Sequence, residues 1–301
     1  MFYTKFLTKI YCFVILSALC LTSNAVVLKN LYMSSKILNA EVDYSIYIPD
    51  RFVNSEIKLP VIYCLPGLSC TDEQFFDFSN LAQTLDEKIH KNTSFPLILV
   101  VPFSSDKIYY YMNSFDGQFM WEEMFVKEFV PYIETHYNVS NKYYERGIMG
   151  ISMGGYGALL NSINNPEMFI ACAAFSSGLR TDQQLIELSQ PDYNHRYGLS
   201  LGKDLTNEKR ITPHYKRKEI VNIIEKVEEK YLKKTKYLLH CGDDDIFING
   251  NKILKDAMHK KGISTEFIEM RGKHDWNYWK TYLYDGIKFI SEKISTSRKQ
   301  R

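Results

Sequence analysis

A serine between two glycines is the first feature of the sequence that could do chemistry. Ser152 is the centre of the segment Gly150-Ile151-Ser152-Met153-Gly154, which has the pattern Gly-x-Ser-x-Gly. An apolar run over 147–151 precedes this serine and a helical pattern over 153–164 follows it, as in a nucleophile elbow. Glycines let neighbouring chain pass such a strained turn without a Cβ clash. The motif predicts that Ser152 is a nucleophile; the alternative is an inert serine in a tight turn.

A serine hydroxyl becomes a good nucleophile only when a base accepts its proton. Along a chain with this elbow, the serine is followed by an acid and then by a histidine. Of the seven histidines, His274 is the only one just beyond a late predicted strand, 265–270. His240 falls inside the predicted strand 236–241, which is typical of a core histidine with satisfied hydrogen bonds. We therefore expect His274 to be the base.

The acid of such a triad is expected after the strand that precedes the histidine. Asp243, Asp244 and Asp245 follow the predicted strand 236–241, and their spacing does not choose among them. Adjacent carboxylates repel, so we expect only one to face inward and pair with the imidazole. Asp275 is a poor candidate because the side chains of neighbouring residues diverge. The acid would fix the histidine tautomer and stabilise the imidazolium ion.

Acyl transfer through a serine also needs donors for the oxyanion of the tetrahedral intermediate. The backbone N–H of Met153 lies at the expected start of a helix, where the helix dipole is positive. The loop 65–70 follows the strand predicted over 58–65 and contains Gly67, which permits a tight turn. We expect this turn to aim the N–H of Leu68 at the same point.

The elements that must position these residues alternate along the chain. Short continuous apolar runs are typical of strands buried on both faces of a parallel sheet. Thr71, with Gln74 three residues later, predicts a capping box at the start of a helix. The predicted strands are 42–48, 58–65, 96–101, 147–151, 169–175, 236–241 and 265–270, and the predicted helices are 71–85, 119–136, 153–164, 251–261 and 278–294. Residues 180–234 are less regular, end in a charged helix expected over 218–234, and are interpreted as an insertion beside the site.

Composition narrows the class of protein. With 301 residues, 45% hydrophobic and 24% charged, the chain can bury one large core and is not disordered. A net charge of +2 gives no electrostatic case for a nucleic-acid partner. We expect an α/β fold with one mostly parallel, doubly wound sheet and helices on both faces, as a single domain over 26–301.

Residues 1–25 have the features of a signal peptide. Lys5 and Lys9 are followed by an apolar stretch over 10–21, and Ala25 ends a small-residue cleavage site. An uncleaved membrane anchor is the alternative; beyond this stretch no run of about 18 apolar residues occurs. We expect a secreted or periplasmic protein.

Cysteine usage points to packing and not to metal binding. Four cysteines follow the signal segment, in or beside apolar runs, where the small side chain usually serves as a core residue. No Cys/His spacing suggests zinc. Export could still oxidise the four, so their redox state is left open: Cys64, Cys70, Cys172 and Cys241.

Taken together, the motifs over 65–73, 150–158, 241–245 and 274–279 resemble the esterase D branch of the α/β hydrolases, along roughly 42–290. This family includes S-formylglutathione hydrolases, tributyrin-type esterases and feruloyl or acetyl-xylan esterases. The segment 67–75 looks like the first of these and 274–279 like the other two. The resemblance implies an α/β-hydrolase fold, selects Asp245 as the acid, and supports Leu68 and Met153 as oxyanion donors.

The expected function is therefore that of a serine carboxylesterase for short-chain acyl esters, using Ser152, His274 and Asp245 and no metal or cofactor. The expected partner is a small ester substrate, with a carbohydrate-linked ester as one option, and not nucleic acid or membrane. The alternatives are an S-formylglutathione hydrolase-like thioesterase, acyl transfer to a sugar, and an exported binding protein on the same fold. Aromatic residues within 109–121 and 276–279 could line a substrate pocket, although we expect most of them to be packing residues.

Overall fold

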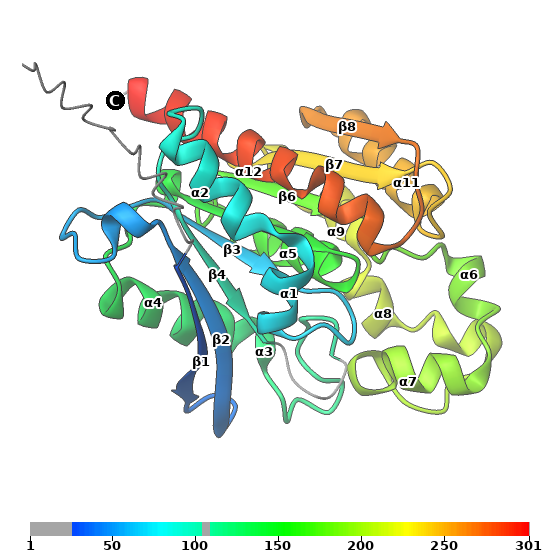
Figure 1. Cartoon of the computed structure of the whole chain (residues 1–301). Coiled ribbons are helices and arrows are strands. Elements are labelled where there is room, and N and C mark those ends of the chain that lie inside the picture. Colours follow the sequence, from blue (N-terminus) through cyan, green and yellow to red (C-terminus); the bar gives the residue numbers. More distant parts are fainter. Residues whose placement is uncertain (1–25, 104–108, 301) are drawn as a thin grey trace, which may run out of the picture.

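A computed structural model describes residues 26–103 and 109–300, so the predicted signal segment 1–25 lies outside the described residues. They form one eight-stranded sheet with the strand order β1-β2-β4-β3-β5-β6-β7-β8 (Figure 1). The pairs from β4 to β8 are parallel, and only β1 with β2 and β2 with β4 run antiparallel. The strands are β1 (Val26–Ser35), β2 (Ala40–Ile48), β3 (Val61–Leu65), β4 (Ile98–Pro102), β5 (Arg146–Ile151), β6 (Ala171–Phe175), β7 (Lys236–Gly242) and β8 (Thr265–Met270).

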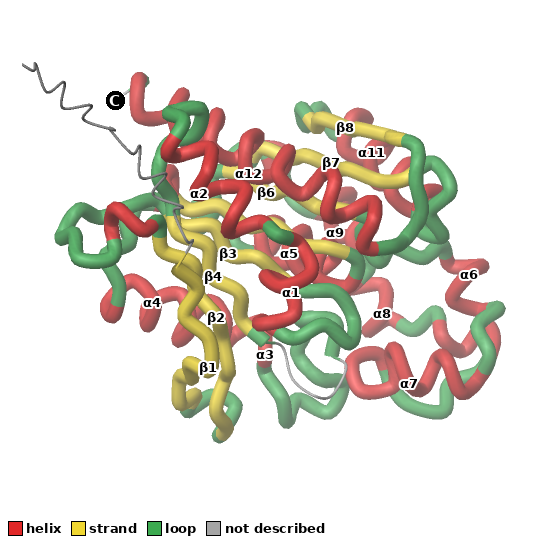
Figure 2. Tube along the Cα trace, viewed as in Figure 1, coloured by secondary structure: helices red, strands yellow, loops and turns green. Residues whose placement is uncertain are grey.

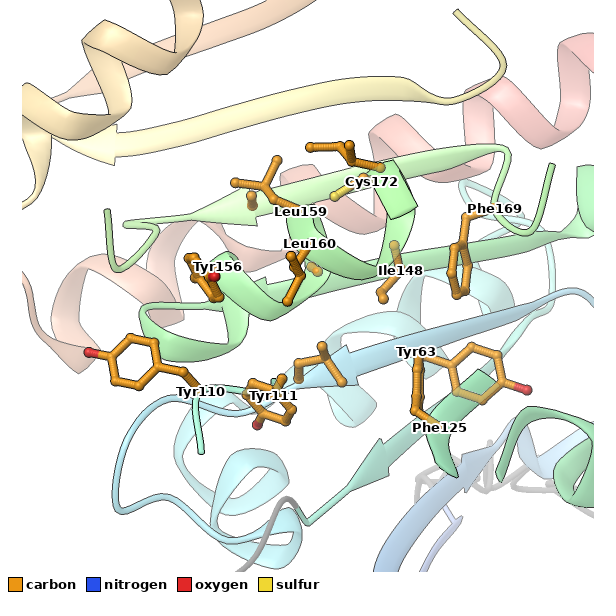
Figure 3. Close-up of a cluster of buried hydrophobic side chains, with 14 of the residues drawn as sticks. Tyr63, Tyr110, Tyr111, Phe125, Ile148, Tyr156, Leu159, Leu160, Phe169 and Cys172 are labelled. Atoms are coloured by element: carbon orange, nitrogen blue, oxygen red, sulfur yellow. The ribbon is translucent and has the colours of Figure 1, made fainter. Parts of the chain in front are cut away.

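The central strands are buried on both faces, which explains why the sequence shows them as unbroken apolar runs. All residues of β3, β5 and β6 are buried. Successive side chains of a strand point to opposite faces. In β3, Tyr63 accordingly packs into one hydrophobic cluster, while Ile62 and Cys64 pack into the other. Figure 3 shows the first cluster, where Tyr63 and Phe125 lie together and Tyr156 lies nearer to Tyr110.

Helices cover both faces of the sheet, and Figure 2 shows them as two layers around the strands. The face in front in Figure 1 carries α1 (Asp72–Ser79), α2 (Leu81–His90) and α12 (Trp276–Lys299). The other face carries α5 (Met153–Asn164), α9 (Ile220–Lys226), α11 (Ile248–Lys260), and α3 (Trp121–Met124) joined to α4 (Val130–His136) by a π-helical turn (Phe125–Phe129). The predicted mostly parallel α/β sheet is therefore confirmed. No helix among the described residues is long and apolar enough to cross a membrane.

Three sequence expectations need correction. The helix expected over 71–85 is two helices, because Asn80 takes the left-handed conformation (φ 53°) between them; the Thr71–Gln74 capping box is present. The charged helix expected over 218–234 is also two, α9 and α10 (Glu229–Leu232), because Val227 is extended (ψ 137°). Strand β1 was not expected; as an exposed edge strand it has no continuous apolar run.

The irregular region contributes α9 to one face of the sheet, and three further helices form a layer beyond the carboxyl ends of the strands. Besides α9 and α10, it contains α6 (Asp182–Ile186), α7 (Gln190–Leu201) and α8 (Pro213–Lys218). In Figure 1 these three helices lie at the end of the sheet toward which the arrows of β3 and β7 point. In open α/β sheets this edge carries the functional site.

Candidate active site

The turn between β5 and α5 holds Ser152 in a strained backbone conformation. Its φ of 54° and ψ of −115° are unusual for a residue with a side chain. The Ser152 N–H donates to the Phe175 carbonyl at 2.8 Å, and the Ser152 carbonyl accepts from Tyr156 and Gly178 at 3.1 and 2.8 Å. These bonds to the neighbouring strand and helix hold the turn in place, so the hydroxyl stands at the edge of the sheet.

The glycines of the motif are required by close approach of the chain. A Cβ at Gly150 would lie 2.2 Å from the Gly154 carbonyl oxygen, and one at Gly154 would lie 1.9 Å from the Leu65 carbonyl oxygen. Backbone atoms cannot move aside as the end of a flexible side chain can. Any other residue at these two positions would therefore displace Ser152 from the strand that precedes it.

The structure brings Ser152, His274 and Asp245 into one hydrogen-bonded chain. Ser152 Oγ lies 2.8 Å from His274 Nε2, and His274 Nδ1 lies 2.9 Å and 3.0 Å from Asp245 Oδ2 and Oδ1. The three residues follow β5, β7 and β8, whose carboxyl ends share one edge because these strands are parallel. This is the arrangement in which histidine can accept the serine proton while a carboxylate orients its ring.

The other carboxylates near His274 have different partners. Asp243 Oδ1 accepts a hydrogen bond from the Gly272 N–H at 2.9 Å, and Asp244 is exposed. Asp275 caps α12 by accepting the Tyr278 N–H at 3.1 Å. Of the three aspartates that sequence spacing left open, the structure therefore places only Asp245 against the imidazole.

The surroundings of Asp245 favour its ionised form. Burial raises the pKa of this carboxyl group, but the hydrogen bond and charge of His274, together with the Phe247 N–H at 2.8 Å, leave the pKa below its ordinary value. The Ser176 hydroxyl lowers it further. Ser176 is itself held by the Trp279 Nε1–H, which donates to its oxygen at 3.0 Å. A fixed carboxylate is therefore available to stabilise an imidazolium ion.

The imidazole of His274 is also fixed by two aromatic side chains that the sequence did not single out for this role. The ring of Phe247 lies 4.9 Å away, centroid to centroid, at an interplanar angle of 76°. The ring of Trp279 lies 5.0 Å away at 87°. Both contacts are edge-to-face, the preferred geometry for aromatic rings. They restrain the ring from tilting out of line with Ser152.

Two backbone N–H groups are available beside the serine. Within the described part of the chain, neither the Leu68 N–H nor the Met153 N–H has a hydrogen-bond partner. The loop that carries Leu68 passes close to the serine, since a Cβ at Gly67 would lie 3.5 Å from Ser152 Cβ. The Tyr111 hydroxyl donates to the Pro66 carbonyl at 2.8 Å and so braces this loop. That brace was not expected from the sequence.

A cavity of about 220 Å³ opens over Ser152, and we call it the serine pocket. From the aromatic windows named by sequence, Tyr110, Trp276 and Trp279 line it, whereas Trp121 is fully buried in the core. Sequence reasoning missed the remaining large side chains of the wall: Arg196, Ile246 and Phe247. Arg196 belongs to α7, so the helical insertion lies beside the site as expected.

His240 is buried in the sheet and takes no part in the serine pocket. Its Nδ1 lies 2.7 Å from the Tyr278 hydroxyl, and the side chain is 0% exposed, as expected of a core histidine. The expectation that its hydrogen bonds are all satisfied is wrong, because among the described residues Nε2 has no hydrogen-bond partner. Nε2 lies 3.7 Å from Asp285 Oδ2, beyond hydrogen-bond reach. Burial lowers the pKa of His240 to about 4. The folded protein therefore holds this imidazole neutral.

This burial predicts a pH dependence of stability. Between the ordinary histidine pKa of about 6.5 and the folded value of about 4, the unfolded chain binds a proton that the folded chain does not. The contribution of the neutral imidazole to the free energy of unfolding is therefore fully present above this window. It decreases as the pH is lowered through the window, by about 2 kcal/mol from pH 7 to pH 5. Urea unfolding at both pH values should show a smaller loss in His240→Asn than in wild type. Replacing the exposed His259 by Asn should leave the loss unchanged; an unchanged loss in His240→Asn would contradict the prediction.

The four cysteines of the described chain are free and buried: Cys64, Cys70, Cys172 and Cys241. Burial raises the pKa of the Cys70 thiol, at the rim of the serine pocket, to about 12. It raises the pKa of the Cys64 thiol, inside β3, still further. These thiols remain protonated and unreactive at neutral pH.

One group of side chains within the described residues has the composition of a cation site. Ligand atoms of Asp50, Asp86 and His90 lie within 4.8 Å of one another. Asp86 Oδ1 already accepts the Tyr47 hydroxyl at 2.9 Å, and His90 Nδ1 lies 2.9 Å from the Asp86 carbonyl. None of the three lines the serine pocket, so the group lies outside the chemistry described above.

Comparisons with known proteins show the family and the fold of this chain. A family model described as "Putative esterase" matches residues 35–290, which include Ser152, Asp245 and His274. An acetyl esterase from Caldicellulosiruptor saccharolyticus is 24% identical over 195 residues, which are 61% of this chain and 68% of that protein. A solved ferulic acid esterase is 25% identical with a TM-score of 0.76, over 90% of this chain and 98% of that chain. An S-formylglutathione hydrolase from Agrobacterium tumefaciens is 19% identical with a TM-score of 0.67, over 88% and 94%. The expected family and α/β-hydrolase fold are thus confirmed.

Proposed function

Because the chain belongs to the family described as "Putative esterase" and is an ester-hydrolysing serine hydrolase, we propose that it is a carboxylesterase for short-chain acyl esters. Ser152 is its nucleophile, His274 its general base and acid, and Asp245 the carboxylate that orients the histidine. The observation that carries this assignment is the 2.8 Å separation of Ser152 Oγ and His274 Nε2, continued to Asp245 at 2.9 Å.

In the first half of the proposed reaction, Ser152 Oγ attacks the ester carbonyl carbon while His274 Nε2 accepts the hydroxyl proton. The carbonyl oxygen becomes an oxyanion, which the N–H groups of Leu68 and Met153 stabilise. Each such donor contributes about 2.7–4 kcal/mol where one has been removed by mutation. The C–O bond to the alcohol then breaks, and the imidazolium returns the proton to the leaving alkoxide.

In the second half, water replaces the alcohol at the acyl carbon. His274 Nε2 accepts a proton from the water as it attacks the acyl-enzyme, and the same two N–H groups hold the second oxyanion. The bond to Ser152 Oγ breaks, and His274 returns its proton to the serine. The acid is released and the starting state of the enzyme is restored, so one ester and one water give one alcohol and one acid.

The size of the serine pocket supports a small acyl or alcohol group. Its volume of about 220 Å³ is below the range of about 300–1,000 Å³ that is usual for drug-sized ligands. Its walls are largely aromatic, through Tyr110, Phe247, Trp276 and Trp279. We therefore expect acetyl and butyryl esters to be better substrates than long-chain esters.

A substrate panel tests this proposal. The purified protein should hydrolyse p-nitrophenyl acetate and butyrate, and kcat/KM should fall by more than about 10-fold for the dodecanoate if the pocket limits chain length. S-formylglutathione and methyl ferulate belong in the same panel. Faster turnover of S-formylglutathione than of every oxygen ester would replace the carboxylesterase by a thioesterase, and absence of turnover and of fluorophosphonate labelling would leave a binding protein.

We further propose that the protein is exported after cleavage behind Ala25. The basic, apolar and small-residue pattern of 1–25 supports this, and buried thiols with raised pKa values are compatible with an oxidising compartment. Intact-mass analysis of protein collected outside the cytoplasm should give a chain beginning at Val26. A mass that includes residues 1–25 would favour the uncleaved anchor.

A further inference from the structure

Among the described residues that line the serine pocket, Arg196 has the one side chain, apart from the His274 imidazole, that can carry a positive charge. It lies on α7, is half-buried, and shares the pocket with Ser152 and His274. The other described residues of the lining contribute apolar, aromatic, hydroxyl or thiol side chains or backbone, and none of them is a carboxylate. A fixed positive charge on an otherwise uncharged wall is an unusual feature for a site that takes only neutral esters.

The other arginines that are buried or half-buried donate hydrogen bonds to acceptors within the protein. Arg210 is 2% exposed and donates to four backbone carbonyls and to Gln190. Arg146 pairs with Glu134. Arg180 donates to the Tyr197 hydroxyl at 3.2 Å and lies over the Phe247 ring. These arginines have structural roles, because the protein itself supplies their acceptors.

Arg196 differs, because within residues 26–103 and 109–300 its guanidinium makes no hydrogen bond or ion pair. The carboxylate one helical turn earlier, Asp192, instead accepts the Ser189 hydroxyl at 2.6 Å at the start of α7. Asn194, near the middle of the helix, exchanges two hydrogen bonds of 2.7 and 2.9 Å with Asp204, which follows the end of the helix. These bonds hold the helix that carries Arg196, while the described residues supply no hydrogen-bond or ion-pair partner for its guanidinium.

The neighbours of Arg196 also hold its position toward the pocket. The next residue, Tyr197, is buried, and its ring lies 4.8 Å from that of Tyr110, centroid to centroid. Tyr110 lines the serine pocket and has a positive φ of 54°, so its placement is itself unusual. A half-buried guanidinium in such a setting binds an anion more strongly than an exposed one does, since water competes less for its N–H groups.

We propose that Arg196 binds a carboxylate on the substrate, so that the preferred esters carry one anionic group on a flat, aromatic-sized arm. This inference rests on the proposed esterase function and specifies its substrate class. One guanidinium balances one negative charge and can hold a carboxylate through two parallel N–H···O bonds, whereas a phosphate dianion would leave charge uncompensated. The aromatic walls of Tyr110, Phe247 and Trp276 fit a flat group between the charge and the serine.

Two pairs of esters test the proposal, each differing in charge and closely matched in shape. For the alcohol arm the pair is 4-carboxyphenyl acetate and 4-carbamoylphenyl acetate. For the acyl arm it is mono(4-nitrophenyl) terephthalate and 4-nitrophenyl 4-carbamoylbenzoate, whose rigid rings prevent the carboxylate from attacking its own ester. The quantity compared is the ratio of kcat/KM for the carboxylate ester to kcat/KM for the amide ester.

On at least one arm this ratio should be about 10-fold higher in wild type than in Arg196→Gln, since charge-assisted bonds are the stronger ones. The amide esters should change by less than about 3-fold, and Arg196→Lys should keep part of the preference. Arg51→Gln, at an exposed arginine outside the pocket, should keep the wild-type ratio. Raising the salt concentration should reduce the ratio in wild type.

A ratio that is the same in wild type and Arg196→Gln on both arms would overturn the role of Arg196. Hydrolysis of p-nitrophenyl acetate that depends on Ser152 is measured on the same preparations and reports on the proposed function alone. If the protein hydrolyses this ester but Arg196→Gln leaves the ratio of kcat/KM unchanged, only the proposed substrate class is contradicted. A protein that hydrolyses none of the esters contradicts the esterase assignment and, with it, the inference.

Discussion

Replacing Ser152 by alanine is expected to lower kcat for p-nitrophenyl butyrate by about 10⁶-fold, the scale of loss measured when another serine hydrolase loses its nucleophile. The reason is chemical: without Oγ no acyl-enzyme forms, and only binding and the N–H groups of Leu68 and Met153 remain. KM should change little, because the substitution removes a single oxygen atom from the lining and leaves the large side chains of the serine pocket in place. Steady-state kinetics and fluorophosphonate labelling measure both effects.

The fold of this variant should remain intact. Alanine at position 152 keeps the same φ and ψ as serine and all three backbone hydrogen bonds, so circular dichroism and Tm should stay close to wild type. Ser162→Ala is a matched control on the same helix: its buried hydroxyl donates to the Leu159 carbonyl at 3.0 Å and does not line the serine pocket. Equal loss of activity in both variants, or retained turnover in Ser152→Ala, would contradict the nucleophile assignment.

Local sequence patterns predicted the central elements well because their burial is complete. Helix α5 has the predicted bounds, since a glycine-rich start and an end near Pro166 define it without help from distant contacts. Strand β8 also has its predicted bounds. Elements whose limits depend on a single backbone conformation were less predictable. Asn80 takes the left-handed conformation and divides the first helical region into two helices. The helical periodicity of the sequence does not predict such a residue.

The three side chains of the triad could be placed together from the sequence because topology does most of that work. Parallel strands end at a common edge, so residues that follow β5, β7 and β8 converge without any knowledge of side-chain packing. The choice of Asp245 from three adjacent aspartates was different, since it depends on which carboxylate the turn after β7 points inward. Spacing could not supply that; the family resemblance did, and the hydrogen bonds agree with it.

The walls of the serine pocket were beyond prediction for a physical reason. Arg196 comes from an insertion whose helices are short, and their placement depends on tertiary contacts such as the five hydrogen bonds of Arg210. Phe247 lies two residues after the aspartates, and no sequence pattern marks it. It restrains the imidazole through a ring contact with His274, which only the structure shows. Tyr111 supports the oxyanion loop across a long separation in sequence. Part of the wall of the serine pocket and the support of the neighbouring loop therefore come from residues that only the three-dimensional structure brings near the triad.

Replacing Asp245 by asparagine is expected to lower kcat by about 10⁴-fold while KM changes little. Asparagine has nearly the shape of aspartate, and its oxygen can still accept the Phe247 N–H that Asp245 accepts at 2.8 Å. What it removes is the negative charge and one acceptor at His274 Nδ1. The imidazole can then take the wrong tautomer, with its proton on Nε2, where it cannot accept the proton of Ser152. Steady-state kinetics across pH measure this effect.

The neighbouring aspartates provide the matched controls for this experiment. Asp243→Asn and Asp244→Asn change the same charge in the same turn, but neither side chain contacts the imidazole. Their kcat should stay within about 3-fold of wild type, since a solvent-exposed charge acts weakly on a neighbouring site. If all three aspartate-to-asparagine variants lowered kcat equally, the cause would be the combined negative charge of the turn. A hydrogen bond from one particular carboxylate to His274 would then be excluded as the cause. A large loss confined to Asp245→Asn would instead show that the carboxylate acts through the 2.9 Å contact with His274 Nδ1.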